Sequence, residues 1–394
     1  IARDLDFSDR FEMISLPGAD SLVLTEGMSR SSPPVGQARS GGAQDTYVNY
    51  ALYDALGAAY AVNVLVAPDS TLLVTVYDVR GQGVRQAVPL RVTSVSPPGF
   101  RMAVHRVSDE VVRAAAGSPG IAATQLLIIQ HGRVYRIGAD GAEAVPLSPA
   151  GVNAMSPTWA PDGRRFAYME FAAGAGRLYV QGLGNGERQL VSPTAQSLNF
   201  TPAFSPDGRT LAYARANEEL THLFAYNLAE NCCLQRLTAG RFSDNLSPTF
   251  SPDGRRIAFV SDRPGSAQIY VMSSDGTGQE LFAPFDYGVT GSSNAPEWSP
   301  DGLNLAFHRE IAGNPQVFVM DVATRSVRQL TSAGRNEDPT WAPDGRHLAF
   351  VSTRTGSRQV WLIDLDTGRV RQLTRLGEAR LPSWSPRIPE SSNP

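Results

Sequence analysis

The stretch Ser247–Gly254 reads SPTFSPDG, and it is one of five near-copies of the same eight-residue motif. The other copies are SPTWAPDG at Ser156–Gly163, TPAFSPDG at Thr201–Gly208, APEWSPDG at Ala295–Gly302 and DPTWAPDG at Asp338–Gly345. The aspartates of the five copies, Asp162, Asp207, Asp253, Asp301 and Asp344, are separated by 45, 46, 48 and 43 residues. A period of about 40–50 residues with short strands is typical of β-propeller blades.

Each motif predicts a hairpin between two strands. Proline presets φ at the second residue of a turn, aspartate bonds back to the backbone, and glycine accepts a positive φ. The strand after the turn has an alanine between large residues, as in Ile257-Ala258-Phe259, so we expect its alanine side to face a closely approaching neighbour. A third strand and a short fourth strand follow, as in QIYVMS at Gln268–Ser273. Four strands per repeat predict one blade.

A further blade is predicted from the two ends of the repeat region. The first end offers a second, a third and a fourth strand at Gln125–Gln130, Arg133–Ile137 and Ala144–Leu147. The other end offers only a first strand, LPSWSP at Leu381–Pro386. Together they complete a blade and remove open sheet edges. The sequence therefore predicts a mainly β protein with a six-bladed β-propeller closed by its C-terminal strand.

A small α/β domain is expected before the propeller, because residues 1 to about 117 lack the repeat. We place the propeller at 118–394. Apolar spacing predicts helices over Ile1–Phe11, Thr46–Leu56 and Phe100–Ala116, strands over Tyr60–Val66, Leu72–Val79 and Val84–Val95, and a loop over Leu16–Asp45.

Charge and composition limit the kinds of partner that we expect. The chain has 35 Lys and Arg against 38 Asp and Glu, a net charge of −3, so we expect no nucleic-acid partner. No apolar run approaches the roughly 20 residues that span a bilayer, so we expect peripheral membrane association at most, and a monomer. Cys232 and Cys233 are adjacent, and they form either a vicinal disulfide or two thiols in a hairpin turn. We expect the two thiols.

The residues quoted above carry a resemblance to the TolB family. Two stretches of the first domain are similar to the family's N-terminal domain: ALYDALGAAYAVNVLVAPDSTLLVTVYDV at 51–79 and MAVHRVSDEVVRAAAGSPGIAATQLLII at 102–129. The WSPDG-type blades and the closing PSWSP resemble its propeller. The resemblance implies a non-enzymatic, periplasmic protein–protein interaction adaptor of the Tol–Pal system that supports outer-membrane integrity and cell division. It implies the peptidoglycan-associated lipoprotein Pal as partner at the propeller mouth, and TolA through a segment that would precede Ile1.

No catalytic constellation, metal site or cofactor motif is predicted. The sequence has no G-x-S-x-G or H-E-x-x-H pattern, and the five histidines fall in different elements without ligand spacing. The aspartates of the Pro-Asp-Gly motifs are explained by turn geometry.

A polar ring at one mouth of the channel is the candidate site. Asparagine recurs just before the first strands, and charged residues accompany it; asparagine also suits loop backbone, a reading compatible with binding. We expect the partner-binding residues to be Asn153, Asn199, Arg241, Asn245, Asn294, Arg335, Asn336, Glu337 and Arg380. Glu297 also stands out, because the equivalent positions hold Thr, Ala or Ser; it either reaches channel water or pairs with an arginine.

Two other classes of protein remain open from the residues alone. One is a propeller enzyme or accessory domain that binds a peptide or saccharide in the channel mouth. A lyase of this kind would need His, Arg and Lys clustered around a metal, and the scattered histidines argue against it. The other class, a purely structural scaffold, would need no polar mouth.

Overall fold

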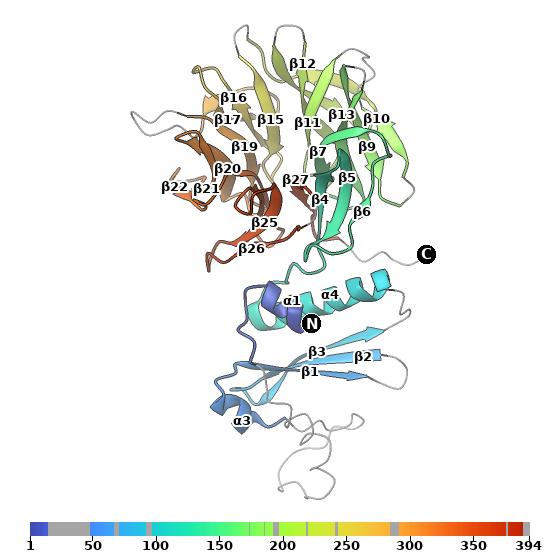
Figure 1. Cartoon of the computed structure of the whole chain (residues 1–394), viewed down its shortest axis with the longest axis vertical. Helices are drawn as coiled ribbons and strands as arrows, with labels where there is room; N and C mark the ends of the chain where they lie inside the picture. Colours follow the sequence, from blue (N-terminus) through green and yellow to red (C-terminus); the bar gives the residue numbers. More distant parts are fainter. Residues whose placement is uncertain are drawn as a thin grey trace, which may run out of the picture. The chain divides into compact units, whose positions relative to one another are not determined.

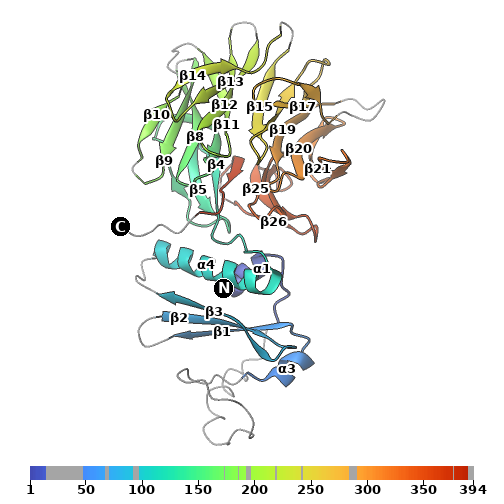
Figure 2. The ribbon, with the colours of Figure 1, turned by 180° about the vertical axis from the view of Figure 1, so that it is seen from behind.

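The computed structural model describes residues 1–14, 48–66, 71–91, 97–172, 174–184, 186–191, 197–217, 220–240, 243–283, 291–375 and 377–388, and every structural statement below concerns these residues. They form two compact units, Ile1–Gly120 and Ile121–Pro394, coloured from blue to red along the chain in Figures 1 and 2. The sequence placed this boundary after residue 117. We describe the two units separately.

The first unit is a three-stranded antiparallel sheet of order β1-β2-β3 with helices against it. Its elements are α1 (Ala2–Phe7), α3 (Tyr50–Ala55), β1 (Tyr60–Val66), β2 (Thr71–Asp78), β3 (Gly83–Arg91) and α4 (Pro97–Ala116). The core joins Val74 and Val76 of β2 to Val107 and Val111 of α4. Alternation along the strand and the 3–4 spacing along the helix place these valines on facing surfaces.

The predicted elements of the first unit are present with altered bounds. The helix expected over Ile1–Phe11 ends at Phe7, followed by Ser8, whose hydroxyl donates to the Leu5 carbonyl at 2.6 Å. The helix expected from Thr46 begins at Tyr50, capped by the Asn49 side chain, which accepts from the Leu52 N–H at 3.1 Å. A side chain that accepts this bond fixes a helix start more sharply than apolar spacing does. The loop predicted at Leu16–Asp45 lies outside the described residues.

The second unit is built of sheets that repeat one order of antiparallel strands, and a single parallel pairing joins two of these repeats among the described residues. Eight strands form one connected sheet: β7 (Asn153–Trp159), β8 (Arg165–Ala172), β9 (Ala175–Gly182), β10 (Arg188–Leu190), β11 (Leu198–Phe204), β12 (Thr210–Ala216), β13 (Thr221–Asn227) and β14 (Cys232–Arg236). Two four-stranded sheets follow: β15 (Asn245–Phe250), β16 (Arg256–Ser261), β17 (Gln268–Ser273) and β18 (Glu280–Leu281), then β19 (Ser293–Trp298), β20 (Asn304–Ile311), β21 (Asn314–Asp321) and β22 (Val327–Gln329).

The last two sheets differ in how the chain supplies them. One is β23 (Asn336–Trp341), β24 (His347–Ser352), β25 (Gln359–Asp364) and β26 (Val370–Gln372). The other combines both ends of the unit: β27 (Arg380–Trp384), β4 (Gln125–Gln130), β5 (Arg133–Gly138) and β6 (Val145–Pro146). In it β27 pairs antiparallel with β4, and Trp384 lies opposite Leu126.

The first strands β7, β11, β15, β19, β23 and β27 share one irregularity. In each, the pairing with the second strand shifts register next to a residue with positive φ. These residues, with φ between 47° and 52°, all precede a proline: Ser156, Thr201, Ser247, Ala295, Asp338 and Leu381. Such a bulge bends the strand and re-aims its side chains. Each first strand contacts the next, and β27 contacts both β23 and β7.

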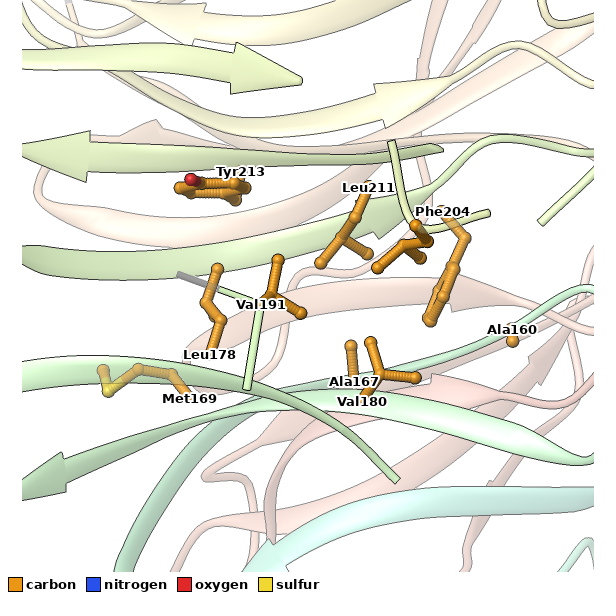
Figure 3. Close-up of a cluster of buried hydrophobic side chains, with 10 residues drawn as sticks. Ala160, Ala167, Met169, Leu178, Val180, Val191, Phe204, Leu211 and Tyr213 are labelled. Atoms are coloured by element: carbon orange, nitrogen blue, oxygen red, sulfur yellow. The ribbon is translucent and has the colours of Figure 1, made fainter. Parts of the chain in front are cut away.

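The Pro-Asp-Gly motifs form the predicted turns. In the turn after β11, Asp207 Oδ1 accepts from the Arg209 N–H at 3.0 Å, and Gly208 has φ 68°. The expectation for the alanine of the second strand is also confirmed, because Ala167 of β8 packs against the next four-strand repeat. It lies in one buried cluster with Leu178 and Val180 of β9 and with Leu211 of β12 (Figure 3). Burying each such large side chain contributes about 1.5–3 kcal/mol.

Candidate partner-binding site

Three of the predicted asparagines are buried, and their side-chain amides donate hydrogen bonds within the protein. Asn199, Asn245 and Asn336 are at most 1% exposed. The Nδ2 of Asn245 donates to Thr221 O (3.3 Å) and Ser243 O (3.1 Å), and that of Asn199 donates to Gly176 O (3.0 Å). The bonds to Gly176 and Thr221 tie the start of a first strand to the third strand of the preceding repeat, so these amides position the strand starts.

Asn336 shows the same role most completely. Its Nδ2 donates to Gln316 Oε1 at 2.8 Å and to the carbonyls of Ala333 and Gly334, while its Oδ1 accepts from Arg354 Nη2 at 3.0 Å. Both ends of the amide are therefore satisfied inside the protein.

The remaining asparagines lie at other register positions of their first strands. Counted from the shared proline, the buried position holds Ala154 in β7 and Ser293 in β19, so Asn153 lies one residue earlier and Asn294 one residue later. Asn153 is exposed and Asn294 is half-buried. Aligning the copies on their prolines reveals this offset, which the recurrence of asparagine alone conceals. Arg241 lies outside the described residues.

The predicted charged residues gather around β23. Arg335 Nη2 lies 3.2 Å from Glu337 Oε1, and half of the Arg335 side chain is exposed. Glu337 acts electrostatically on two groups absent from the prediction, His308 of β20 and Asp338 of β23. These residues come from neighbouring sheets, so only the packed fold assembles them.

His308 and Asp338 form the centre of this cluster. The Asp338 N–H donates to His308 Nδ1 at 3.2 Å, which leaves the ring proton on Nε2. Burial lowers the pKa of His308 to about 4, so the ring is neutral. Enclosure raises the pKa of Asp338 to about 7, although 26% of its side chain remains open to water.

Two arginines act electrostatically on the Asp338 carboxyl, and neither makes a side-chain hydrogen bond or ion pair within the described residues. Arg380, which the sequence singled out, and Arg358, which it did not, both act to lower the pKa of Asp338. Their guanidinium donors are therefore available to another carboxylate, which they suit geometrically. The sequence does mark His308 as unusual. The other five second strands carry an apolar residue at the equivalent position, opposite the residue two before the shared proline: Ile129, Met169, Ala214, Val260 and Val351.

Glu297 does not pair with an arginine within the described residues, and its carboxylate instead contacts a neighbouring first strand. Its Oε1 accepts from Thr340 Oγ1 and from the Trp341 N–H, both at 3.0 Å. Burial raises the pKa of Glu297 to about 7, and these two hydrogen bonds oppose the rise. The residue therefore joins β19 to β23.

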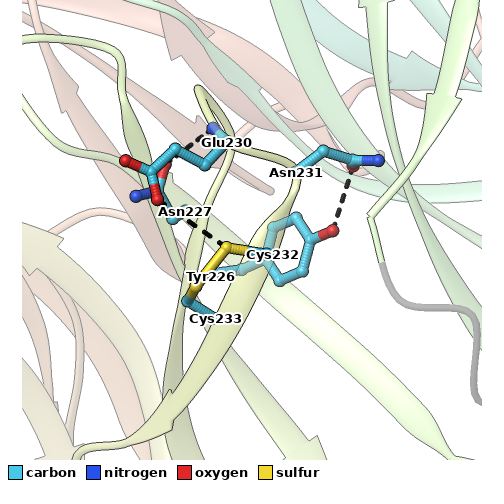
Figure 4. The surroundings of a disulfide bond; sticks show 6 residues. All are labelled: Tyr226, Asn227, Glu230, Asn231, Cys232 and Cys233. Carbon is cyan, nitrogen blue, oxygen red and sulfur yellow. Dashed lines mark hydrogen bonds between the residues drawn. A yellow bond between two sulfur atoms is a disulfide. The ribbon is translucent and has the colours of Figure 1, made fainter.

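The cysteine pair forms a bond, so the expectation of two thiols was wrong. Cys232 and Cys233 are joined as a vicinal disulfide at the start of β14 (Figure 4). The backbone at Cys233 accommodates this with φ 65°. Glu230 lies beside Cys232 in the same hairpin, with its Oε2 3.8 Å from Sγ.

Repeated antiparallel sheets whose first strands contact one another in sequence order define the class of this protein, a β-propeller. Residues 122–284 and 287–389 match the TolB beta propeller domain family. The chain belongs to this family.

Individual relatives agree with that assignment. The chain is 35% identical over 126 residues to the Tol-Pal system protein TolB of Alcanivorax borkumensis, a match covering 29% of each chain. It is 33% identical over 198 residues to the protein of the same name from Azoarcus sp., covering 49% of this chain and 41% of the relative. The matches thus span less than half the length of these curated relatives. The crystal structure of TolB from Acinetobacter baumannii shares the fold, with a TM-score of 0.76, 24% identity and 86% of both chains covered.

Among the described residues, no helix combines the length and the apolar character that crossing a membrane requires.

Proposed function

We propose that this protein is a non-enzymatic, periplasmic adaptor of a Tol–Pal system that binds the peptidoglycan-associated lipoprotein Pal. The observation that carries the proposal is the family match over most of residues 122–389. The relatives named Tol-Pal system protein TolB support it. On this proposal the protein supports outer-membrane integrity and cell division, and TolA is its second partner.

We infer further that the second unit is a ring of six blades closed by β27. The pairing of β27 with β4 and its contacts with β23 and β7 support this inference. A closed ring has no open sheet edge, which makes it a rigid support for binding loops.

Pal is proposed to bind at the mouth formed by the starts of the first strands. The exposed or half-buried members of the predicted set supply the contacts: Asn153, Asn294, Arg335, Glu337 and Arg380. The buried Asn199, Asn245 and Asn336 hold the strand starts in place beneath them.

Calorimetric titration of the full chain with the soluble domain of a Pal-type lipoprotein from the same organism tests the proposal. We expect saturable binding that R335A/R380A weakens at least tenfold, because a buried interface arginine commonly contributes about 2 kcal/mol or more. The control is R209A/R255A in the Pro-Asp-Gly turns, at the opposite ends of the strands, which should leave the affinity unchanged. Absence of binding by the unaltered chain would refute the proposed partner.

A further inference from the structure

The six first strands divide into two groups at one register position. Two residues before the shared proline, consecutive strands β7, β11 and β15 carry apolar side chains, whereas β19, β23 and β27 carry polar or charged ones. In order, the six residues are Met155, Phe200, Leu246, Asn294, Glu337 and Arg380. Since consecutive first strands are in contact, each group is contiguous. We call the two groups the apolar arc and the charged arc.

Exposed apolar residues extend the apolar arc toward solvent. Phe171, next to the end of β8, is 41% exposed, and Leu198, the first residue of β11, is 36% exposed. Both are paired in register with Gly176 of β9, so they flank this glycine from its two sides. Gly176 lets β9 approach β11 closely, because a Cβ there would lie 3.0 Å from the Asn199 carbonyl oxygen.

The charged arc offers cations. Glu337 is already paired with Arg335 at 3.2 Å. Arg358, in the loop between β24 and β25, and Arg380 act on Asp338 without a direct side-chain bond among the described residues. The unmatched chemistry of this arc is therefore guanidinium, whose planar fork suits a carboxylate.

We infer that the mouth recognises a segment of a protein partner that presents an apolar side chain to the apolar arc and a carboxylate to the charged arc. The apolar side chain packs against Phe171 and Leu198, and the carboxylate pairs with Arg358 and Arg380. Charge complementarity selects an acidic segment over a basic one, and the apolar contact supplies affinity that salt does not screen. The assignment of this segment to Pal rests on the proposed function. The predicted chemistry of the segment rests only on the residues of the two arcs.

Titration of the soluble domain of a Pal-type lipoprotein against paired variants tests the inference. R358A/R380A should weaken binding at least tenfold and reduce its dependence on salt concentration. F171S/L198S should weaken binding by a similar factor with the salt dependence retained. All four side chains are exposed or half-buried, so unchanged melting temperatures serve as the folding control. Equal affinity of R358A/R380A and the unaltered chain would overturn the inference.

A displayed random-peptide library separates this inference from the proposed function. Selection on the unaltered chain should enrich peptides that combine Asp or Glu with a large apolar residue, and R358A/R380A should lose the acidic enrichment. Selection without acidic enrichment would overturn the inference whatever the result with Pal. Acidic enrichment together with no Pal binding would uphold it and refute the proposed partner.

Discussion

Glu297 and Trp341 join two first strands by reciprocal hydrogen bonds. Glu297 Oε1 accepts from the Trp341 N–H at 3.0 Å, and Trp341 Nε1 donates to the Glu297 carbonyl oxygen at 3.1 Å. A related contact recurs between β23 and β27, where Thr340 Oγ1 accepts from the Trp384 N–H at 3.1 Å. It recurs again between β27 and β7, where Ser383 Oγ accepts from the Trp159 N–H at 3.3 Å. A side-chain acceptor thus links the first strands in these three pairs of described residues, and among the three acceptors Glu297 alone is ionisable.

This arrangement makes stability depend on pH. The pKa of Glu297 is raised to about 7 in the folded protein, so between its ordinary value and pH 7 the folded state binds more protons than the unfolded state. The free energy of unfolding should therefore fall as pH rises through this window, by on the order of 3 kcal/mol. E297Q keeps the acceptor oxygen without the charge, so it should be more stable than the unaltered chain at pH 8.

Urea unfolding at pH 5 and pH 8 measures the effect. E280Q is the matched control, because the Glu280 side chain is 60% exposed and should leave the pH profile unchanged. If E297Q and the unaltered chain have parallel profiles, Glu297 does not titrate as described.

Trp384 should contribute strongly to closure by β27. It is buried, and its Nε1 donates to Thr124 Oγ1 at 2.8 Å. W384A should lower the free energy of unfolding by about 3–5 kcal/mol, and removal of residues 381–394 should unfold or aggregate the propeller, because it exposes two strand edges. Thermal unfolding checks both; an unchanged melting temperature after truncation would contradict closure by β27.

The main contribution of Asn336 should be to the stability of the folded protein. Because Asn336 is buried and bonded at both ends, N336A removes one hydrogen bond each from Gln316 Oε1 and Arg354 Nη2 and should cost about 1–3 kcal/mol. The exposed Asn153 is the control, and N153A should stay within about 0.5 kcal/mol of the unaltered chain. Chemical unfolding of both variants distinguishes them, and equal stabilities would show that the Asn336 bonds are dispensable.

Gly276 and Gly265 form a matched pair for testing the approach of neighbouring sheets. Their φ values, 94° and 95°, are nearly equal, but a Cβ at Gly276 would lie 2.6 Å from Leu237 O, whereas at Gly265 nothing lies within 4 Å. Both alanine variants bear the backbone strain, and only G276A forces a backbone shift, typically about 1–3 kcal/mol. G276A should melt well below G265A; coincident melting curves would exclude close packing at Leu237.

Reduction of the vicinal disulfide should change stability little. The two cysteines are adjacent, so their bond closes almost no loop and hardly restricts the unfolded chain. We expect a dithiol reductant to change the free energy of unfolding by no more than about 0.5 kcal/mol, as surface changes typically do, and so to leave the melting temperature nearly unchanged. Alkylation followed by mass spectrometry confirms the bond, because it should label cysteine only after reduction.

The sequence by itself determined the repeated strands and turns of this protein. Pro-Asp-Gly dictates its turn through the φ preferences of three neighbouring residues, and Ile257-Ala258-Phe259 sets its two faces by alternation, so both could be read locally. Tertiary structure alone decided the rest. Asn336 and Asn153 stand three and four residues before the shared proline, an offset that the sequence contains, but only the packed sheets decide that the first of these positions is buried and the second exposed. His308, Asp338 and Arg380 belong to three different sheets. The hydrogen bond between His308 and Asp338 and the effect of Arg380 on Asp338 arise only because packing brings the three together in a partly enclosed place, where water screens charges weakly.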